Sequence, residues 1–152
     1  MLATHGPSLS RLAASYTRDH GERDDLFQEI ALAIWRALPA FRGECSERTF
    51  VFRVAHNRGL SHISRRRLQI ADHEMAMDPP DAMPNPEQAF STEQQAQRLF
   101  DAVQQLPLGY RQVVTLALEG MSYGEIAEVL GISESNVGAR LTRARQILRR
   151  LV

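Results

Sequence analysis

The sequence has one cysteine, no lysine and no long apolar run. Cys45 alone cannot form an internal disulfide or a cysteine-rich zinc site. The five histidines are scattered, and His56 and His62 are six residues apart, which does not place them on one helical face. We therefore expect no metal site and no cofactor. No apolar run reaches the length of a membrane span and no signal peptide heads the chain, so we expect a cytoplasmic protein.

The sequence also has no net charge, although its charges are separated into blocks. Residues 36–67 hold eight arginines against two glutamates, and residues 72–101 hold seven acidic residues against one arginine. The final segment is rich in arginine again. These blocks predict two positive surfaces joined by an acidic connector, a distribution that suits binding to nucleic acid.

The spacing of apolar residues predicts helices throughout and no strand. One helix is expected over residues 24–38, with acidic residues in its first turn, and another from residue 49 to about 66. The first has an apolar stripe that includes Trp35. In the second helix we expect one face to point inward. Gly59 should lower the stability of this helix by about 1 kcal/mol relative to alanine, a loss that packing must offset. The inward residues predicted for the second helix are Phe50, Val51, Val54, Ala55, Leu60 and Ile63.

The middle of the chain separates two small domains. Four prolines among acidic residues, Pro79, Pro80, Pro84 and Pro86, predict a mobile linker with a partly extended backbone. Further helices are expected from residue 91 to Pro107 and over residues 110–119. We thus predict an all-α protein with one domain at 1–68, a linker at 69–91 and a second domain at 92–152.

The last thirty residues carry the pattern of a helix-turn-helix. Ser122 and Glu125 have the spacing of a capping box, and Gly131 stands where a left-handed residue ends the first helix. Ser133 caps the second helix, whose inner face is Val137, Leu141, Ala144 and Leu148. The outer face offers Asn136, Ala139, Arg140, Thr142 and Arg143 to base edges in a major groove. The alternative is a helical hairpin with solvated arginines, which does not require caps and glycine at this spacing.

Three segments in this order resemble the extracytoplasmic-function (ECF) sigma factors of bacterial RNA polymerase. They are DDLFQEIALAIWRAL at 24–38, RTFVFRVAHNRGLSHISRRR at 48–67, and residues 106–151, which include SYGEIAEVLGISESNVGARLTRARQILRR. The resemblance implies a two-domain promoter-specificity subunit that is not itself an enzyme. Its implied partners are core RNA polymerase, promoter DNA and an anti-sigma factor.

The resemblance also implies residue roles. Asp25, Gln28 and Glu29 would contact the polymerase, and Trp35 would be either an interface anchor or part of the core. Residues at the second segment would contact melted promoter DNA near minus ten, while the loop at 42–46 would hold a flipped base. The residues implied there are Phe50, Arg53, Asn57, Arg65 and Arg66. Ser133 and Ser135, near a helix N-terminus, would bind phosphates beside the bases read at minus thirty-five.

The chain departs from the family pattern at Phe50, Ser61, Ser64 and Gly138, which puts some melting and base contacts in doubt. Two other functions therefore stay open. One is a stand-alone helix-turn-helix regulator that binds duplex DNA as a dimer, although no dimer stripe is visible. The other is an interaction protein that kept the fold and lost promoter opening. Arg65 and Arg66 could also simply be a solvated helix end.

Overall fold

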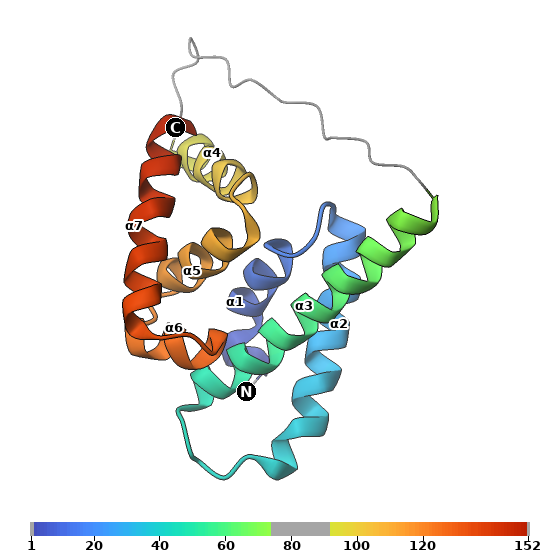
Figure 1. The fold of residues 1–152 in the computed structure, drawn as a ribbon. Helices are drawn as coiled ribbons and strands as arrows, with labels where there is room; N and C mark the ends of the chain where they lie inside the picture. The colour runs from blue at the N-terminus through green and yellow to red at the C-terminus, as the bar shows by residue number, and fades with distance from the viewer. Residues whose placement is uncertain (1, 74–91, 152) are drawn as a thin grey trace.

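The computed structural model describes residues 2–73 and 92–151, and over those residues all of its regular elements are helices joined by short turns and loops (Figure 1). The elements are α1 (Leu2–Ala14), α2 (His20–Ala37), the short 3-10 helix η1 (Leu38–Ala40), α3 (Glu47–His73), α4 (Thr92–Gln104), α5 (Leu108–Leu118), α6 (Tyr123–Leu130) and α7 (Glu134–Leu151). The predicted all-α class is confirmed. Most of the predicted linker, residues 74–91, lies outside the described residues. Within those residues, no helix is long and apolar enough to cross a membrane.

Helices α1, α2 and α3 pack together around one buried cluster. The cluster draws on all three helices and on the turn after α1, with Leu9, Tyr16, Ile30 and Phe52 each at most 3% exposed, and it continues into the helices of the second half of the chain. Helix α1 was not predicted from the sequence, because it contains Pro7 and three serine or threonine residues that lower helix propensity. Its helix depends on burying the apolar side against α2 and α3, a contact that local sequence does not reveal.

The start of α2 was predicted four residues too late. Asp19 is the N-cap, and its side chain accepts a hydrogen bond from the backbone N–H of Glu22 at 2.8 Å. Glu22, rather than Asp24, is therefore the acidic residue of the first turn. Asp24 lies a turn further on, where the helix dipole has less influence on its carboxylate.

Helix α3 is longer than predicted, and its buried face agrees in part with the prediction, because Val51, Ala55 and Ile63 are buried while Phe50 and Val54 are half-buried. Ser46 caps its start by accepting from the backbone N–H of Thr49 at 3.1 Å, and the helix continues to His73. Its buried side follows Phe52, Ala55, Gly59 and Ile63. The inward prediction for Leu60 is wrong, because that residue lies beside this face and is 38% exposed.

Helices α4 to α7 form the second unit, which packs against the first mainly through α3 and α6 and, to a lesser extent, through α1 and α5. Figure 1 shows α6 beside the N-terminal end of α3. The turn after α5 uses Gly120 at a φ of 80°, where a left-handed residue reverses the chain. The unit's core is formed by Val113, Leu116, Ile126, Val129, Val137, Leu141 and Ala144.

Candidate nucleic-acid interface

The turn between α6 and α7 has the geometry that the sequence predicts. The Ser122 hydroxyl accepts from the Glu125 N–H at 3.1 Å, and the Glu125 carboxylate accepts from the Ser122 N–H at 3.0 Å. Gly131 has a φ of 70°, and the Ser133 hydroxyl accepts from the Asn136 N–H at 3.1 Å. Both caps and the left-handed glycine are therefore confirmed, and they fix the direction in which α7 leaves the turn.

The predicted base-reading residues occupy the solvent side of α7. Asn136, Ala139, Thr142 and Arg143 are exposed, while Arg140 is half-buried. The Arg140 Nε donates to the Asn136 side-chain oxygen at 3.0 Å, and Arg143 donates to Gln146 at 3.2 Å. Ser133 and Ser135 are exposed at the N-terminal end of the same helix. Together these residues form a polar surface along the solvent side of one long helix.

Gly138, the departure within this surface, faces the ring of Tyr123. A Cβ at this position would lie 3.5 Å from the nearest ring carbon, which is ordinary van der Waals contact. The glycine is therefore not required by the packing.

A cavity of about 360 Å³ lies where α3 begins. Phe41 and Phe50 form one side of it, with their ring centroids 4.5 Å apart. Arg42 and Arg53 supply positive charge, and Glu44 and Glu128 supply an equal negative charge, so the lining of the cavity is neutral overall. Cys45 and Glu44 belong to the loop that precedes the helix. Phe50, which we expected to be core, is half-buried and lines this cavity, whereas Phe52 is the aromatic residue within the core. Aromatic faces beside arginines suit an unstacked base and its phosphates.

The remaining predicted DNA residues of α3 lie further along the helix, Asn57 near its middle and Arg65 and Arg66 closer to its C-terminal end. Asn57 and Arg65 are exposed, and so are Ser61 and Ser64 at the positions that depart from the family pattern. The Ser61 hydroxyl donates back to the Asn57 carbonyl at 3.1 Å.

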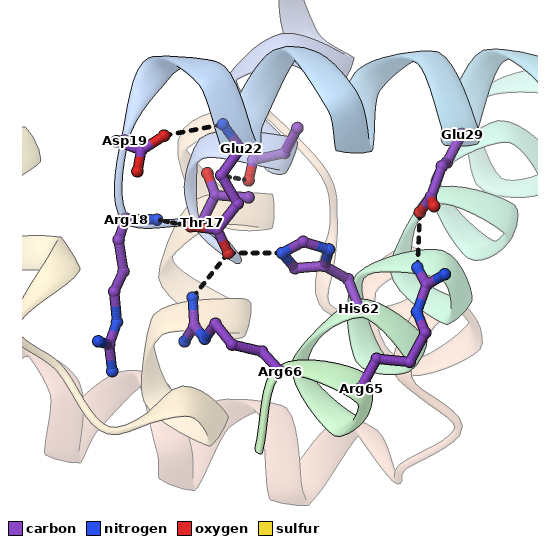
Figure 2. A network of polar contacts seen from close by, with 9 residues as sticks. Thr17, Arg18, Asp19, Glu22, Glu29, His62, Arg65 and Arg66 are labelled. Atoms are coloured by element: carbon purple, nitrogen blue, oxygen red, sulfur yellow. Dashed lines mark hydrogen bonds and ion pairs between the residues drawn. The ribbon is translucent and has the colours of Figure 1, made fainter. Parts of the chain in front are cut away.

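Arg65 and Arg66 are held by acidic residues of α2 rather than simply solvated (Figure 2). Arg66 donates to Glu22 at 2.9 Å, and His62 contacts the same carboxylate oxygen at 2.6 Å. Burial alone would raise the pKa of Glu22, but hydrogen bonds from His62, the Arg18 N–H and Arg66 lower it. Sequence reasoning missed this cluster, because its members lie about forty residues apart.

The predicted polymerase-binding residues lie along α2. Asp25 and Gln28 are exposed, whereas Glu29 accepts a hydrogen bond from Arg65 at 2.8 Å. Trp35 is 71% exposed beside Leu32, which is 48% exposed, so Trp35 does not belong to the core. An exposed tryptophan next to an exposed leucine suits a protein interface.

Comparisons with known proteins match both helical units to one family. The family model for Sigma-70 region 2 matches residues 1–69, and that for Sigma-70, region 4 matches residues 96–148. The chain is 31% identical to the RNA polymerase sigma factor CnrH of Cupriavidus metallidurans over all of this chain and 84% of the relative. This chain is an RNA polymerase sigma factor of the ECF group. The ECF RNA polymerase sigma-E factor of Escherichia coli K12 is 30% identical over 84% of this chain and 72% of the relative.

Two solved structures share the sigma factor's fold. A co-crystal structure of the sigma factor RpoE with the anti-sigma factor NepR from Bartonella quintana has a TM-score of 0.80 at 21% identity, over 99% of this chain and 92% of that one. The structure of CnrH with the cytosolic domain of CnrY has a TM-score of 0.69 at 28% identity, over 99% and 83% of the two chains. Like other sigma factors, the present chain is a regulatory subunit of RNA polymerase.

The sigma factor brings its two units together through contacts that sequence reasoning did not anticipate. Arg48 of α3 donates to both carboxylate oxygens of Glu125, each at 2.9 Å. Arg53, a predicted DNA residue, donates from Nε to the backbone oxygen of Glu128 at 3.4 Å, and Glu128 also lines the cavity. In the sequence the only sign of these contacts is that the residues have opposite charges. Opposite charge alone does not predict which residues pair when the partners lie 75 to 77 positions apart.

Proposed function

We propose that the two units divide the work of promoter recognition. Residues 1–68 would bind core polymerase and melt the promoter near minus ten, while 92–152 would read the element near minus thirty-five, with 69–91 as linker. The aromatic and arginine-lined cavity at the start of α3 and the exposed polar face of α7 support this division. RNA synthesis would belong to the polymerase, which places the sigma factor in the bacterial cytoplasm.

In the first unit, Phe50, Arg53 and Asn57 would contact melted DNA, with a flipped base in the 360 Å³ cavity. Arg65 and Arg66 would hold phosphates from the far end of α3. Glu22 and Glu29 hold these two arginines against α2, which supports a fixed position for the phosphate contacts. Extended side chains fixed in advance lose less entropy when DNA binds.

On the polymerase side, Asp25, Gln28 and Trp35 would form the contact, with Glu29 at its edge. Carboxylates facing basic residues in a partly desolvated interface gain charge-assisted hydrogen bonds. Glu29 would have to release Arg65 before it could accept a hydrogen bond from the polymerase, so its direct contribution would be smaller than that of the other three residues.

On the promoter side, Asn136, Ala139, Arg140, Thr142 and Arg143 would meet base edges. Ser133 and Ser135 would meet phosphates at the helix N-terminus. An Arg143→Ala variant should lose about 1–3 kcal/mol of discrimination at one base pair. Arg149 lies on the exposed last turn of α7, outside this set, so Arg149→Ala should leave the discrimination between base pairs unchanged.

We also propose that an anti-sigma factor controls this protein and that its genes respond to a signal. CnrH is similar to this chain over the chain's whole length, and its structure was solved in complex with the cytosolic domain of CnrY. A protein partner of that kind would keep the sigma factor from polymerase until the signal arrives.

The deciding experiment is run-off transcription from genomic fragments with purified core polymerase, beside DNA binding by the protein alone. Transcripts from fixed start sites that need both components, and that shift with Arg143→Ala, are expected. Specific binding of duplex DNA by the protein alone, with nothing added by polymerase, would instead support a stand-alone regulator.

A further inference from the structure

Gly138 leaves the outward side of α7 without a side chain at one of its edges. Positions 138 and 142 lie one turn apart on a helix, and Ala139 lies on the same side as Thr142, three residues before it. The ring of Tyr123, from the first turn of α6, lies over the bare position, since a Cβ at Gly138 would be 3.5 and 3.9 Å from two of its ring carbons. Tyr123 is 44% exposed, so the ring covers this turn of α7 and still faces solvent.

Two exposed side chains, Ala139 and Thr142, follow this ring across the outward side of α7. The Thr142 hydroxyl donates to the Gly138 carbonyl oxygen at 3.0 Å. This bond uses the only hydrogen of the hydroxyl, so Thr142 has no donor left for a base and offers a methyl group instead. We call Tyr123, Ala139 and Thr142 the apolar edge, because together they present one aromatic ring and two methyl groups.

The opposite edge of the same surface is polar, and its groups are engaged with one another. The Arg140 Nε donates to the Asn136 side-chain oxygen at 3.0 Å. The Arg140 Nη1 lies toward α5, where it would be 3.4 Å from a Cβ at Gly109. Arg143 lies on this edge too and donates to the exposed Gln146, a contact that a base can replace. The outward surface of α7 is therefore divided into an apolar edge and an edge that carries arginines.

Thymine is the base that fits the apolar edge. In the major groove it is distinguished by its C5-methyl group, which makes apolar contacts with alanine, with the threonine methyl group and with aromatic rings. We propose that the apolar edge reads thymine methyl groups in the promoter element near minus thirty-five, and that Tyr123 is a specificity-determining residue supplied by α6. This inference rests on the proposed reading of that element by α7.

Gly138 has a role in this arrangement although the packing does not require it. Alanine fits beside the Tyr123 ring, whereas a long side chain at this position covers the ring or displaces it. The glycine thus admits Tyr123 to the surface that faces the bases. Arg143, on the other edge, would select guanine, so the two edges select different bases.

Deoxyuridine in place of thymine tests the contact, because this replacement removes the methyl group and leaves base pairing unchanged. Holoenzyme assembled from core polymerase and this chain is titrated with duplex promoter in which each thymine of the element, on either strand, is replaced in turn. We expect at least one replacement to weaken binding about two- to fivefold, the effect of one buried methyl group. The same replacement outside the element is the control. An element without thymine on either strand, or one in which no replacement has an effect, overturns the proposal.

Two substitutions of Tyr123 separate a methyl contact from a phosphate contact. Tyr123→Ala removes the ring, so it should weaken binding to the thymine promoter and largely remove the effect of deoxyuridine, because the two changes delete partners of one contact. Tyr123→Phe keeps the ring and should keep the deoxyuridine effect. If Tyr123→Ala keeps the full deoxyuridine effect while binding both promoters less tightly, Tyr123 holds a phosphate and its assignment here is wrong.

Position 138 offers a matched pair of variants. Gly138→Ala fits beside the ring at an ordinary contact distance and should keep the deoxyuridine effect. Gly138→Arg places a guanidinium over the apolar edge, so it should abolish the effect and shift the preferred base toward guanine. A selection from promoters randomised in this element measures the shift. An unchanged thymine preference in Gly138→Arg would contradict the role given to the glycine.

The same selection separates this inference from the proposed function. Arg143→Ala should change the preferred base at a position where deoxyuridine has no effect. If Arg143→Ala alters the selected element while Tyr123→Ala and deoxyuridine do not, the inference falls alone. If no substitution on α7 alters the selected element, the proposed reading of that element by residues 92–152 falls as well.

Discussion

At the scale of single residues, two helical glycines differ in how much space a side chain would have. A Cβ at Gly59 of α3 would lie 2.6–2.7 Å from the Tyr16 ring, whereas one at Gly138 of α7 would lie 3.5 Å from the Tyr123 ring. Tyr16 is buried and cannot move aside easily, while Tyr123 is 44% exposed. We expected packing to offset the loss of helix stability at Gly59. The structure shows that this packing is the close contact between the Tyr16 ring and the helix backbone at Gly59.

Alanine at these two positions should change stability in opposite directions. Gly138→Ala should raise the free energy of unfolding by about 1 kcal/mol, because alanine favours the helix and fits the space. Gly59→Ala should lower it by about 1–3 kcal/mol through overpacking against Tyr16. Urea unfolding of both variants beside wild type measures the difference. Equal effects of one sign would show that helix propensity alone governs both positions.

Trp35 is the residue whose exposure decides between two interpretations of the sequence. With 71% of its surface exposed, Trp35→Ala should leave the midpoint of urea unfolding nearly unchanged. If it anchors the polymerase interface, the same variant should weaken binding to core polymerase by about 2 kcal/mol or more. Trp35→Phe, which keeps most of the apolar surface, should lose less. Unfolding at much lower urea would indicate a structural role instead.

At the scale of elements, the caps of α6 and α7 were the most predictable part of the chain. A capping serine and the N–H that it accepts from are three residues apart, so the signal is local. Helix α1 and the C-terminal end of α3 were not predicted, because packing against other helices outweighs weak local propensity.

The cap of α7 can be tested with two neighbouring serines. Ser133→Ala removes the acceptor for the Asn136 N–H and should lower the free energy of unfolding by about 1 kcal/mol. Ser135→Ala, at an exposed position beyond the cap, should change it by less than about 0.5 kcal/mol. Chemical denaturation at neutral pH compares the two. A larger loss from Ser135→Ala would mean that the cap assignment is wrong.

At the scale of the whole molecule, one hydrogen-bonded chain crosses between the units. Gln112 donates to the Tyr16 oxygen, so the Tyr16 hydroxyl can donate to Nδ1 of His56, 2.6 Å away. This arrangement suits a neutral imidazole. Burial lowers the pKa of His56, which keeps the ring neutral in the folded protein.

Stability should therefore fall as the pH drops below the pKa of an unfolded histidine. The unfolded chain takes up a proton near pH 6.5, which the folded chain resists, so the free energy of unfolding should decrease as the pH falls from 7 to 5. The lowered pKa values of Glu22, Glu119 and Glu125 act below their ordinary value of 4.5, outside this window. Urea titrations across the range should give a flatter profile for His56→Gln. If the free energy of unfolding of His56→Gln depends on pH as steeply as that of wild type, another group causes the pH dependence.

The sequence by itself determined the all-α class, the helix-turn-helix and the outward face of α7, because caps, glycine and helical spacing are local. It also carried the segments by which the family is identified. Only the tertiary structure decided that Trp35 is exposed, that Phe50 lines a cavity and that Glu22 and Glu29 hold the arginines of α3. The same holds for the pairing of Arg48 with Glu125. Charges far apart in sequence have many possible partners, and the packing of α6 against α3 selects among them.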